Sequence, residues 1–273
     1  MDTGSYPPLF SQRNNPNQNV DLDESIQDVE GLDPIPHIDL QYLDLDKLGE
    51  ACKDWGLFRL VNHGIPSELL LRIQDQAREL FALSFEYKQA ILRSPLSYFW
   101  GTTARTTSGG ILRSSKSISW VEVINFPLSQ LPQFQVEDSL LDSFSQAWGV
   151  GVHTDSSILS ILNQDQLGGL EAFRENRWFP IKPIANTLII NLGDMMQAIS
   201  NDKYVSVKHR VRVNKQVDRI SINYFVFPEL DCTIQSSNYK PFTYKDFHAQ
   251  GQTDIETLGY KVGLEGFKRN RDI

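Results

Sequence analysis

Five residues in the second half of the chain have the types and spacing to hold a metal ion and an organic acid. His153 and Asp155 are separated by one residue, so both side chains would lie on the same face of an extended segment. His209, in the valine-rich run "VSVKHRVRV", can bring a third ligand from another strand. Two imidazoles and one carboxylate form the facial triad that binds non-haem Fe(II) and leaves coordination positions open. These three residues are the candidate metal ligands.

Arg219 and Ser221, in "RISINY", follow on the next predicted strand. An arginine binds a carboxylate through two parallel hydrogen bonds, and a nearby hydroxyl can add a third. This pair can therefore bind the distal carboxylate of a dicarboxylic oxo-acid that chelates the iron. Together the five residues indicate an oxygenase that uses Fe(II), 2-oxoglutarate and O2, and we predict no catalytic residue beyond the metal centre.

The other histidines are not accompanied by a third candidate ligand and an Arg-x-Ser pair. His37 and Asp39 in "PHIDL" repeat the His-x-Asp spacing, which shows that the pair also arises by chance, and we expect a structural role for His37. His63 is expected in a turn or in the core, and His248 on a solvated helix.

The composition excludes several classes of protein. A formal net charge of −8 argues against a nucleic-acid partner, because phosphate-binding surfaces are usually basic. The two cysteines, Cys52 and Cys232, offer neither a disulfide framework nor a zinc site. The first thirty residues lack the apolar core of a signal peptide, and no apolar run reaches the roughly 18 residues of a membrane span. We predict a cytoplasmic protein with a small-molecule substrate and no membrane partner.

Several elements precede the candidate site. Residues 1–33 are rich in Pro, Asn and Asp and predict a flexible arm. "PIPHIDL" and "LFRLVNHG" predict strands on either side of a short helix, "LDKLGEACKDWG", that ends at Gly56. A longer helix is expected from Ser67, the predicted N-cap. Its apolar stripe comprises Leu69, Ile73, Ala77, Leu80 and Phe81.

The fold class expected from the remaining pattern is α+β. From about residue 94 to 148 the sequence predicts mainly loop. Thereafter short β-branched segments, with hairpin-type turns at "DQLGG" and "RENR", predict a β-sandwich or a jelly roll, and of the two we expect the jelly roll (double-stranded β-helix). We divide the chain into an arm, an N-terminal mixed helix and strand domain with its connecting region (residues 34–148), and a jelly-roll core with a C-terminal extension (residues 149–273).

At these residues the sequence resembles the plant 2-oxoglutarate-dependent dioxygenase family, and within it the gibberellin 2-beta-dioxygenases. The resemblance rests on "CKDWGLFRLVNHGIP", "HTDSSILSILNQDQLGGLEAF", "TLIINLGDMMQAISNDKYVSVKHRV" and "RISINYFVFP", and extends over most of residues 34–228. It implies that His153, Asp155 and His209 bind iron and that Arg219 and Ser221 bind 2-oxoglutarate. It also implies a reductant such as ascorbate, and a small apolar acid as substrate: first a gibberellin hydroxylated at the 2-beta position, and as the alternative a related plant hormone or specialised metabolite.

One departure from the family concerns residues 120–155. Relatives have a long helical stretch and a strand with a tyrosine before a proline ahead of the His-x-Asp pair, whereas residues 120–146 contain no Tyr. The resemblance therefore implies that an internal segment is absent and that the jelly roll is incomplete. A sheet edge left without its neighbouring strand would favour aggregation.

Two alternatives belong to other classes. The first is a truncated, non-catalytic relative that binds metal, ligand or a full-length paralogue without turnover. The second is a zinc hydrolase or cupin-like binder, which accounts for the two histidines and the aspartate but gives Arg219 and Ser221 no task.

Overall fold

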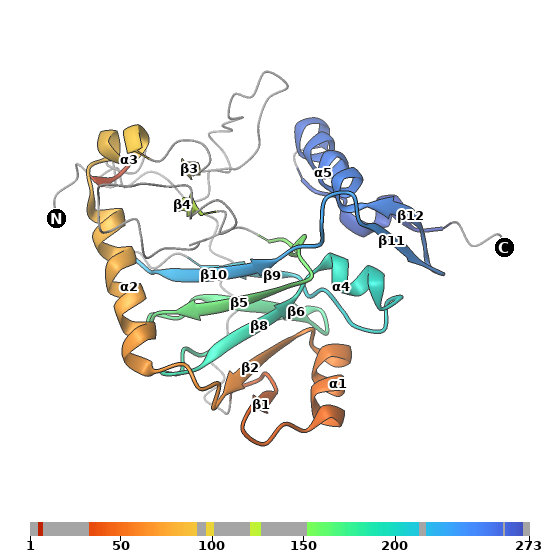
Figure 1. Cartoon of the computed structure of the whole chain (residues 1–273), viewed down its shortest axis with the longest axis horizontal. Coiled ribbons are helices and arrows are strands. Elements are labelled where there is room, and N and C mark those ends of the chain that lie inside the picture. Colours follow the sequence, from red (N-terminus) through yellow and green to blue (C-terminus); the bar gives the residue numbers. More distant parts are fainter. Residues whose placement is uncertain are drawn as a thin grey trace.

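Two β-sheets that face each other form the centre of the molecule (Figure 1). The computed structural model describes residues 5–7, 33–91, 97–100, 121–126, 152–212, 217–258 and 260–269. The larger sheet has the order β1 (His37–Asp39), β2 (Leu57–Val61), β8 (Leu188–Leu192), β5 (Leu159–Gln164) and β10 (Ser221–Val226). The smaller sheet has the order β7 (Arg177–Pro180), β6 (Leu170–Arg174) and β9 (His209–Val211).

Strand alternation explains how the sheets pack. Side chains at every second position of the larger sheet, such as Leu57, Leu162 and Ile189, meet Leu170 and Ala172 of the smaller sheet in one buried apolar cluster. Because burial of each large aliphatic side chain stabilises by about 1.5–3 kcal/mol, this layer holds the two sheets together. The inner face of β5, β8 and β10 thus lies opposite β9, which carries His209.

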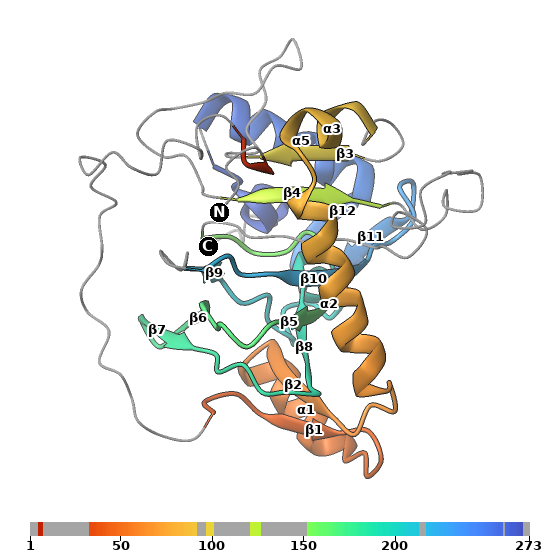
Figure 2. The same ribbon diagram turned by 90° about the vertical axis from the view of Figure 1, so that its left-hand side faces the viewer.

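Two helices accompany the larger sheet. Helix α1 (Leu45–Asp54) begins after Asp44, whose carboxylate accepts hydrogen bonds from two backbone N–H groups. Helix α2 (Ser67–Ala82) runs along one flank of the sheet in both views (Figures 1 and 2). The predicted N-cap at Ser67 is wrong by one residue, because Pro66 occupies that position and Ser67 is already helical.

The region between residues 94 and 148 contains two strands where the sequence predicts loop. β3 (Ser97–Trp100) and β4 (Glu122–Asn125) pair antiparallel, with Trp100, Val123 and Ile124 buried. Each strand is only four residues long, too short for a periodic pattern to emerge from its surroundings. The rest of this region, including the predicted loss of a segment before His153, lies outside the described residues.

The two predicted turns differ. "RENR" is a hairpin, since Arg174 pairs with Arg177 and the two residues between them have positive φ, as type I′ turns require. "DQLGG" is not a hairpin: it carries the chain from β5 in one sheet to β6 in the other. Gly169 makes this crossing possible, because at φ +95° a Cβ there would lie 2.7 Å from the carbonyl oxygen of Arg212.

The C-terminal part forms a separate layer at one side of the sheets (Figure 1). A hairpin, β11 (Thr233–Ser236) and β12 (Tyr239–Thr243), packs with α4 (Asp194–Ile199), α5 (Tyr244–Leu258) and the 3-10 helix η4 (Gly263–Phe267) around buried aromatic side chains. Helix α3 (Phe85–Ile91) lies on the other side of the molecule, near β3.

The predicted α+β class and jelly-roll type of core are confirmed, with the qualification that the described strands form an open sandwich and not a closed barrel. The boundary near residue 148 stays a prediction; β1 and β2, which precede it, belong to the same sheet as β5, β8 and β10. Most of the predicted arm lies outside the described residues. None of the helices in the described ranges has the length and apolar character needed to cross a bilayer.

Candidate metal centre

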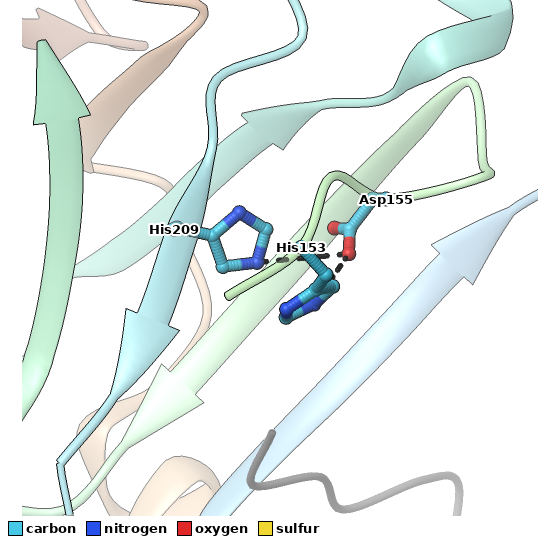
Figure 3. A group of neighbouring side chains, drawn as sticks. All are labelled: His153, Asp155 and His209. Carbon is cyan, nitrogen blue, oxygen red and sulfur yellow. Dashed lines mark ion pairs between the residues drawn. The ribbon is translucent and has the colours of Figure 1, made fainter. Parts of the chain in front are cut away.

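The three candidate ligands converge on one point (Figure 3). One nitrogen each of His153 and His209 and one carboxylate oxygen of Asp155 all lie within 4.8 Å of one another, the only such group of three among the described residues. Asp155 Oδ1 lies 3.4 Å from His153 Nε2 and 3.6 Å from His209 Nε2. Two imidazole nitrogens and one carboxylate oxygen match the donor set of non-haem iron.

The backbone fixes the two histidines against each other. His153 and His209 exchange both backbone hydrogen bonds, at 3.0 and 2.9 Å, as an isolated antiparallel bridge beside β9. Their ring centroids are 4.2 Å apart. The expectation that His153 and Asp155 share an extended segment holds only for His153, since Asp155 lies in irregular chain before β5. Asp155 is instead positioned by the side chains around it.

The two oxygens of Asp155 have different surroundings. Oδ2 accepts hydrogen bonds from Ser160 Oγ on β5, at 3.0 Å, and from Asn191 Nδ2 on β8, at 2.7 Å. Burial of this carboxylate opposes its ionisation, but His209 and His153 together with Asn191 outweigh burial and hold the pKa of Asp155 well below its usual range. Oδ1 thus faces the histidines as an ionised oxygen ligand.

His209 has the tautomer that a metal ligand needs. Its Nδ1 lies 3.2 Å from the carbonyl oxygen of Val207, which can only accept, so Nδ1 carries the hydrogen and Nε2 keeps its lone pair. Burial, followed by the neighbouring His153, lowers the pKa of His209 to about 4. The ring is therefore neutral at physiological pH.

A lysine from the C-terminal segment holds the chain between the candidate ligands His153 and Asp155. Lys261 Nζ donates to the backbone oxygen of Thr154 at 2.8 Å, to Ser156 Oγ at 3.0 Å and to Asp194 Oδ2 at 2.8 Å. The backbone N–H of Asp194 in turn donates to the carbonyl oxygen of Asp155. Lys261 and Asp194 thereby fix the loop on which two of the three ligands lie.

Ser221 is the first residue of β10, and Arg219 lies two residues before it. Arg219 donates from Nε to the carbonyl oxygen of Gly168, from Nη1 to Ser221 Oγ and from Nη2 to Gln164 Oε1, at 2.5, 3.1 and 2.9 Å. None of these acceptors carries a charge, and no described carboxylate lies within ion-pair distance of Arg219. Burial lowers the pKa of Arg219, and Asp165 opposes this effect only from beyond ion-pair distance. Because a partly buried cation without an ion pair is costly, this arrangement suits an anionic ligand such as 2-oxoglutarate.

The other histidines have separate places. His37 forms an ion pair with Asp33 at the surface, His63 accepts an N–H from Ile65 in a turn, and His248 is exposed on α5. They do not join the group of three, as the sequence predicts.

Sequence reasoning missed the residues that support the site, namely Ser160, Gln164, Asn191, Asp194 and Lys261. For the two that bond Asp155 a signal exists: Ser160 interrupts "SILSIL" and Asn191 interrupts "TLIINL", so each is a polar residue in an otherwise apolar strand. Buried polar positions of this kind require a partner.

Two family profiles match this chain. The profile of the 2OG-Fe(II) oxygenase superfamily matches residues 125–228, which include the three candidate ligands, Arg219 and Ser221. The profile described as non-haem dioxygenase in morphine synthesis N-terminal matches residues 35–140.

Curated relatives come from plants. Gibberellin 2-beta-dioxygenase 8 of Arabidopsis thaliana is 31% identical over 278 aligned positions that cover 81% of this chain and 80% of the relative. These positions outnumber all 273 residues of the chain, so the relative has residues at positions that this chain lacks. S-norcoclaurine synthase 1 of Coptis japonica is 26% identical over 86% of this chain and 87% of its own length.

A solved structure agrees with the fold. The crystal structure of JOX2 in complex with 2OG, Fe and JA superposes with a TM-score of 0.72, covers 97% of this chain and 99% of its own, and is 23% identical. With two matching profiles and a relative above 30% identity over most of both lengths, the chain belongs to the 2OG-Fe(II) oxygenase superfamily and is an oxidoreductase whose cofactors are Fe(II) and 2-oxoglutarate.

Proposed function

We propose that His153, Asp155 and His209 hold the Fe(II) and that Arg219 with Ser221 holds the distal carboxylate of 2-oxoglutarate. The observation that carries this proposal is the convergence of two imidazole nitrogens and one ionised carboxylate oxygen within 4.8 Å. The position of Arg219 supports it further, since its three described hydrogen bonds go to uncharged oxygens and leave its charge for an anion.

The chain's own residues prepare the centre for this task. The iron and 2-oxoglutarate, when bound, supply the oxidation, in which O2 is reduced, the oxo-acid becomes succinate and CO2, and the substrate is hydroxylated. Ser160 and Asn191 restrain one oxygen of Asp155, so that the other faces the two rings. Val207 fixes the tautomer of His209. Arg219, which bonds Gln164 at the C-terminal end of β5, would orient the oxo-acid.

For the substrate we propose a small apolar carboxylic acid, specifically a gibberellin hydroxylated at the 2-beta position and thereby inactivated. The support is the likeness to gibberellin 2-beta-dioxygenase 8. S-norcoclaurine synthase 1 also matches over most of its length, so the family alone does not select the substrate. Ascorbate as reductant and a cytoplasmic location stay predictions.

The test is product formation by the purified full chain with Fe(II), ascorbate and 2-oxoglutarate. We expect succinate and 2-beta-hydroxylated product in equal amounts when a gibberellin is present, identified by mass spectrometry. His209→Ala should form neither product. Hydroxylation of another apolar acid, with no gibberellin turned over, would contradict the substrate while leaving the reaction class intact.

The positions absent relative to the Arabidopsis enzyme favour one alternative, a non-catalytic relative that binds both cofactors without turnover. Succinate release separates the two functions, because binding alone produces none. Tight binding of Mn(II) and 2-oxoglutarate with no succinate from any acid tested would establish the alternative.

A further inference from the structure

Gln164 ends β5 directly beside the proposed 2-oxoglutarate residues. It pairs with Ser221 across the antiparallel strands β5 and β10, and only 8% of its surface is exposed. By strand alternation its side chain lies on the same face of β5 as Ser160, which bonds Asp155. On this face of β5, Ser160 near the beginning of the strand supports the candidate metal ligands, and Gln164 at its end supports Arg219.

The orientation of the Gln164 amide is fixed by Arg219. A guanidinium has only donors, so the atom 2.9 Å from Arg219 Nη2 must be the amide oxygen, Oε1. The amide nitrogen, Nε2, is then the remaining polar atom of the side chain. It is buried and has no hydrogen-bond partner among the described residues.

A buried donor without an acceptor is unfavourable and calls for an explanation. The acids nearby do not supply one: Asp165 accepts backbone N–H bonds from Leu167 and Ile220, and neither of its oxygens bonds Gln164. The amide nitrogen adjoins an arginine that has no carboxylate partner in the described ranges. A carboxylate placed there would satisfy both groups.

We propose that Gln164 is a 2-oxoglutarate-binding residue: its Nε2 donates a hydrogen bond to the carboxylate that Arg219 and Ser221 hold, while its Oε1 orients the guanidinium. The inference rests on the proposed function. It makes Gln164 a determinant of specificity for oxo-acids with a second carboxylate. A glutamine suits this position better than a glutamate, because a second anion would neutralise Arg219 and repel the ligand.

The test compares two ligands on Mn(II)-loaded full-length protein under argon, by titration calorimetry. 2-Oxoglutarate carries the distal carboxylate, and 2-oxopentanoate has the same carbon chain without it. For Gln164→Met we expect 2-oxoglutarate to bind roughly 10- to 100-fold more weakly, the range for a hydrogen bond to a charged group, with 2-oxopentanoate nearly unchanged. Gln164→Glu, which keeps the acceptor for Arg219 but adds a charge, should lose at least as much.

Gln74→Met is the matched control. Gln74 is a buried amide on α2 that bonds Asn163 and the backbone of Gln164 but not Arg219. This variant should retain the preference for 2-oxoglutarate over 2-oxopentanoate, even if its melting temperature falls. Equal losses for both ligands in Gln164→Met, or no loss for either, would overturn the inference alone. Failure of the wild-type protein to bind 2-oxoglutarate would overturn the proposed function together with it.

Discussion

Two arginines differ in their charged partners: Arg59 lies on β2 of the larger sheet, and Arg219 lies just before β10 of the same sheet. Arg59 on β2 is 1% exposed and donates to the carboxylate of Asp33 at 2.6 Å, to Thr187 Oγ1 and to the backbone oxygen of Lys182. Arg219, which is partly buried and precedes the edge strand β10, makes the same number of bonds, but all of them to uncharged oxygens. Arg59 has an ion pair within the described chain, whereas Arg219 has none there and interacts with the charge of Asp165 only beyond ion-pair distance. The comparison separates an arginine that stabilises the fold from one suited to binding.

The strongest test of this difference is stability. Arg59→Met leaves Asp33 buried without its cation, and we expect the free energy of unfolding to fall by about 3–5 kcal/mol. At about 2–4 °C per kcal/mol for a chain of this size, the melting temperature should fall by several degrees or more. Arg219→Met should cost less, about 1–3 kcal/mol for the acceptors that lose their donor, because the charge that it removes has no described ion-pair partner. Urea unfolding of both variants measures the two losses in the free energy of unfolding. Equal losses would contradict the proposed difference between the two arginines.

The next largest effect should be that of metal and 2-oxoglutarate on stability, which should depend on the candidate site and not on the residues around Arg59. With Mn(II) and 2-oxoglutarate each at about 100 times its dissociation constant, each bound ligand adds about 2.7 kcal/mol to the folded state. We expect a cooperative thermal transition that moves upward in the wild type and stays in place in His209→Ala. His37→Ala is the control, since His37 has the same His-x-Asp spacing but pairs with Asp33 beside Arg59. Loss of the shift in both variants would mean that the response does not come from the proposed ligands.

Co-substrate binding sharpens the comparison at Arg219 itself. Arg219→Met should weaken the binding free energy of 2-oxoglutarate by about 1.5–3 kcal/mol, the usual contribution of a charge-assisted hydrogen bond. Binding of Mn(II) alone should not change, since Arg219 is proposed to hold the ligand without touching the metal. Titrations with each ligand separately give the answer, and a parallel loss of metal affinity would contradict the separate roles.

A third cation, Lys261, provides the smallest expected effect. It has a carboxylate partner in Asp194, as Arg59 has in Asp33, yet it also bonds Thr154 between two proposed metal ligands. Lys261→Met should therefore weaken Mn(II) binding about 10-fold, the lower end for loss of a group that orients a ligand. Lys261→Arg should restore part of the affinity. Unchanged Mn(II) affinity in Lys261→Met would leave Lys261 a purely structural partner of Asp194.

The grouping of the three candidate ligands is easier to predict from the sequence than the residues that position them. His153, Asp155 and His209 stand out because their chemistry and their strand context are both local properties. Which arginine has a counter-ion is not local: the partners Asp33 and Gln164 lie 26 and 55 residues away from Arg59 and Arg219. Only the folded sheet brings these pairs together.

The helices, strands and turns also divide into those that local sequence predicts and those that depend on contacts between distant segments. Helices α1 and α2 and the hairpin at "RENR" follow from periodicity and turn chemistry within a few residues. The crossing at "DQLGG" has the residues of a hairpin turn, and its true course depends on which sheet the next strand joins. β3 and β4 are stabilised by packing with α2, α3 and β10, which no short window of sequence reveals.

The bond from Lys261 to Thr154 also bears on when the centre can be assembled in the cell. Chains are synthesised from the N-terminus, so His153, Asp155 and His209 leave the ribosome before Lys261 does. Until the segment after α5 has docked, the loop between the proposed ligands His153 and Asp155 lacks the cation that fixes it. We therefore expect iron to enter the protein after its synthesis is complete and not during translation, and nascent chains to bind metal weakly.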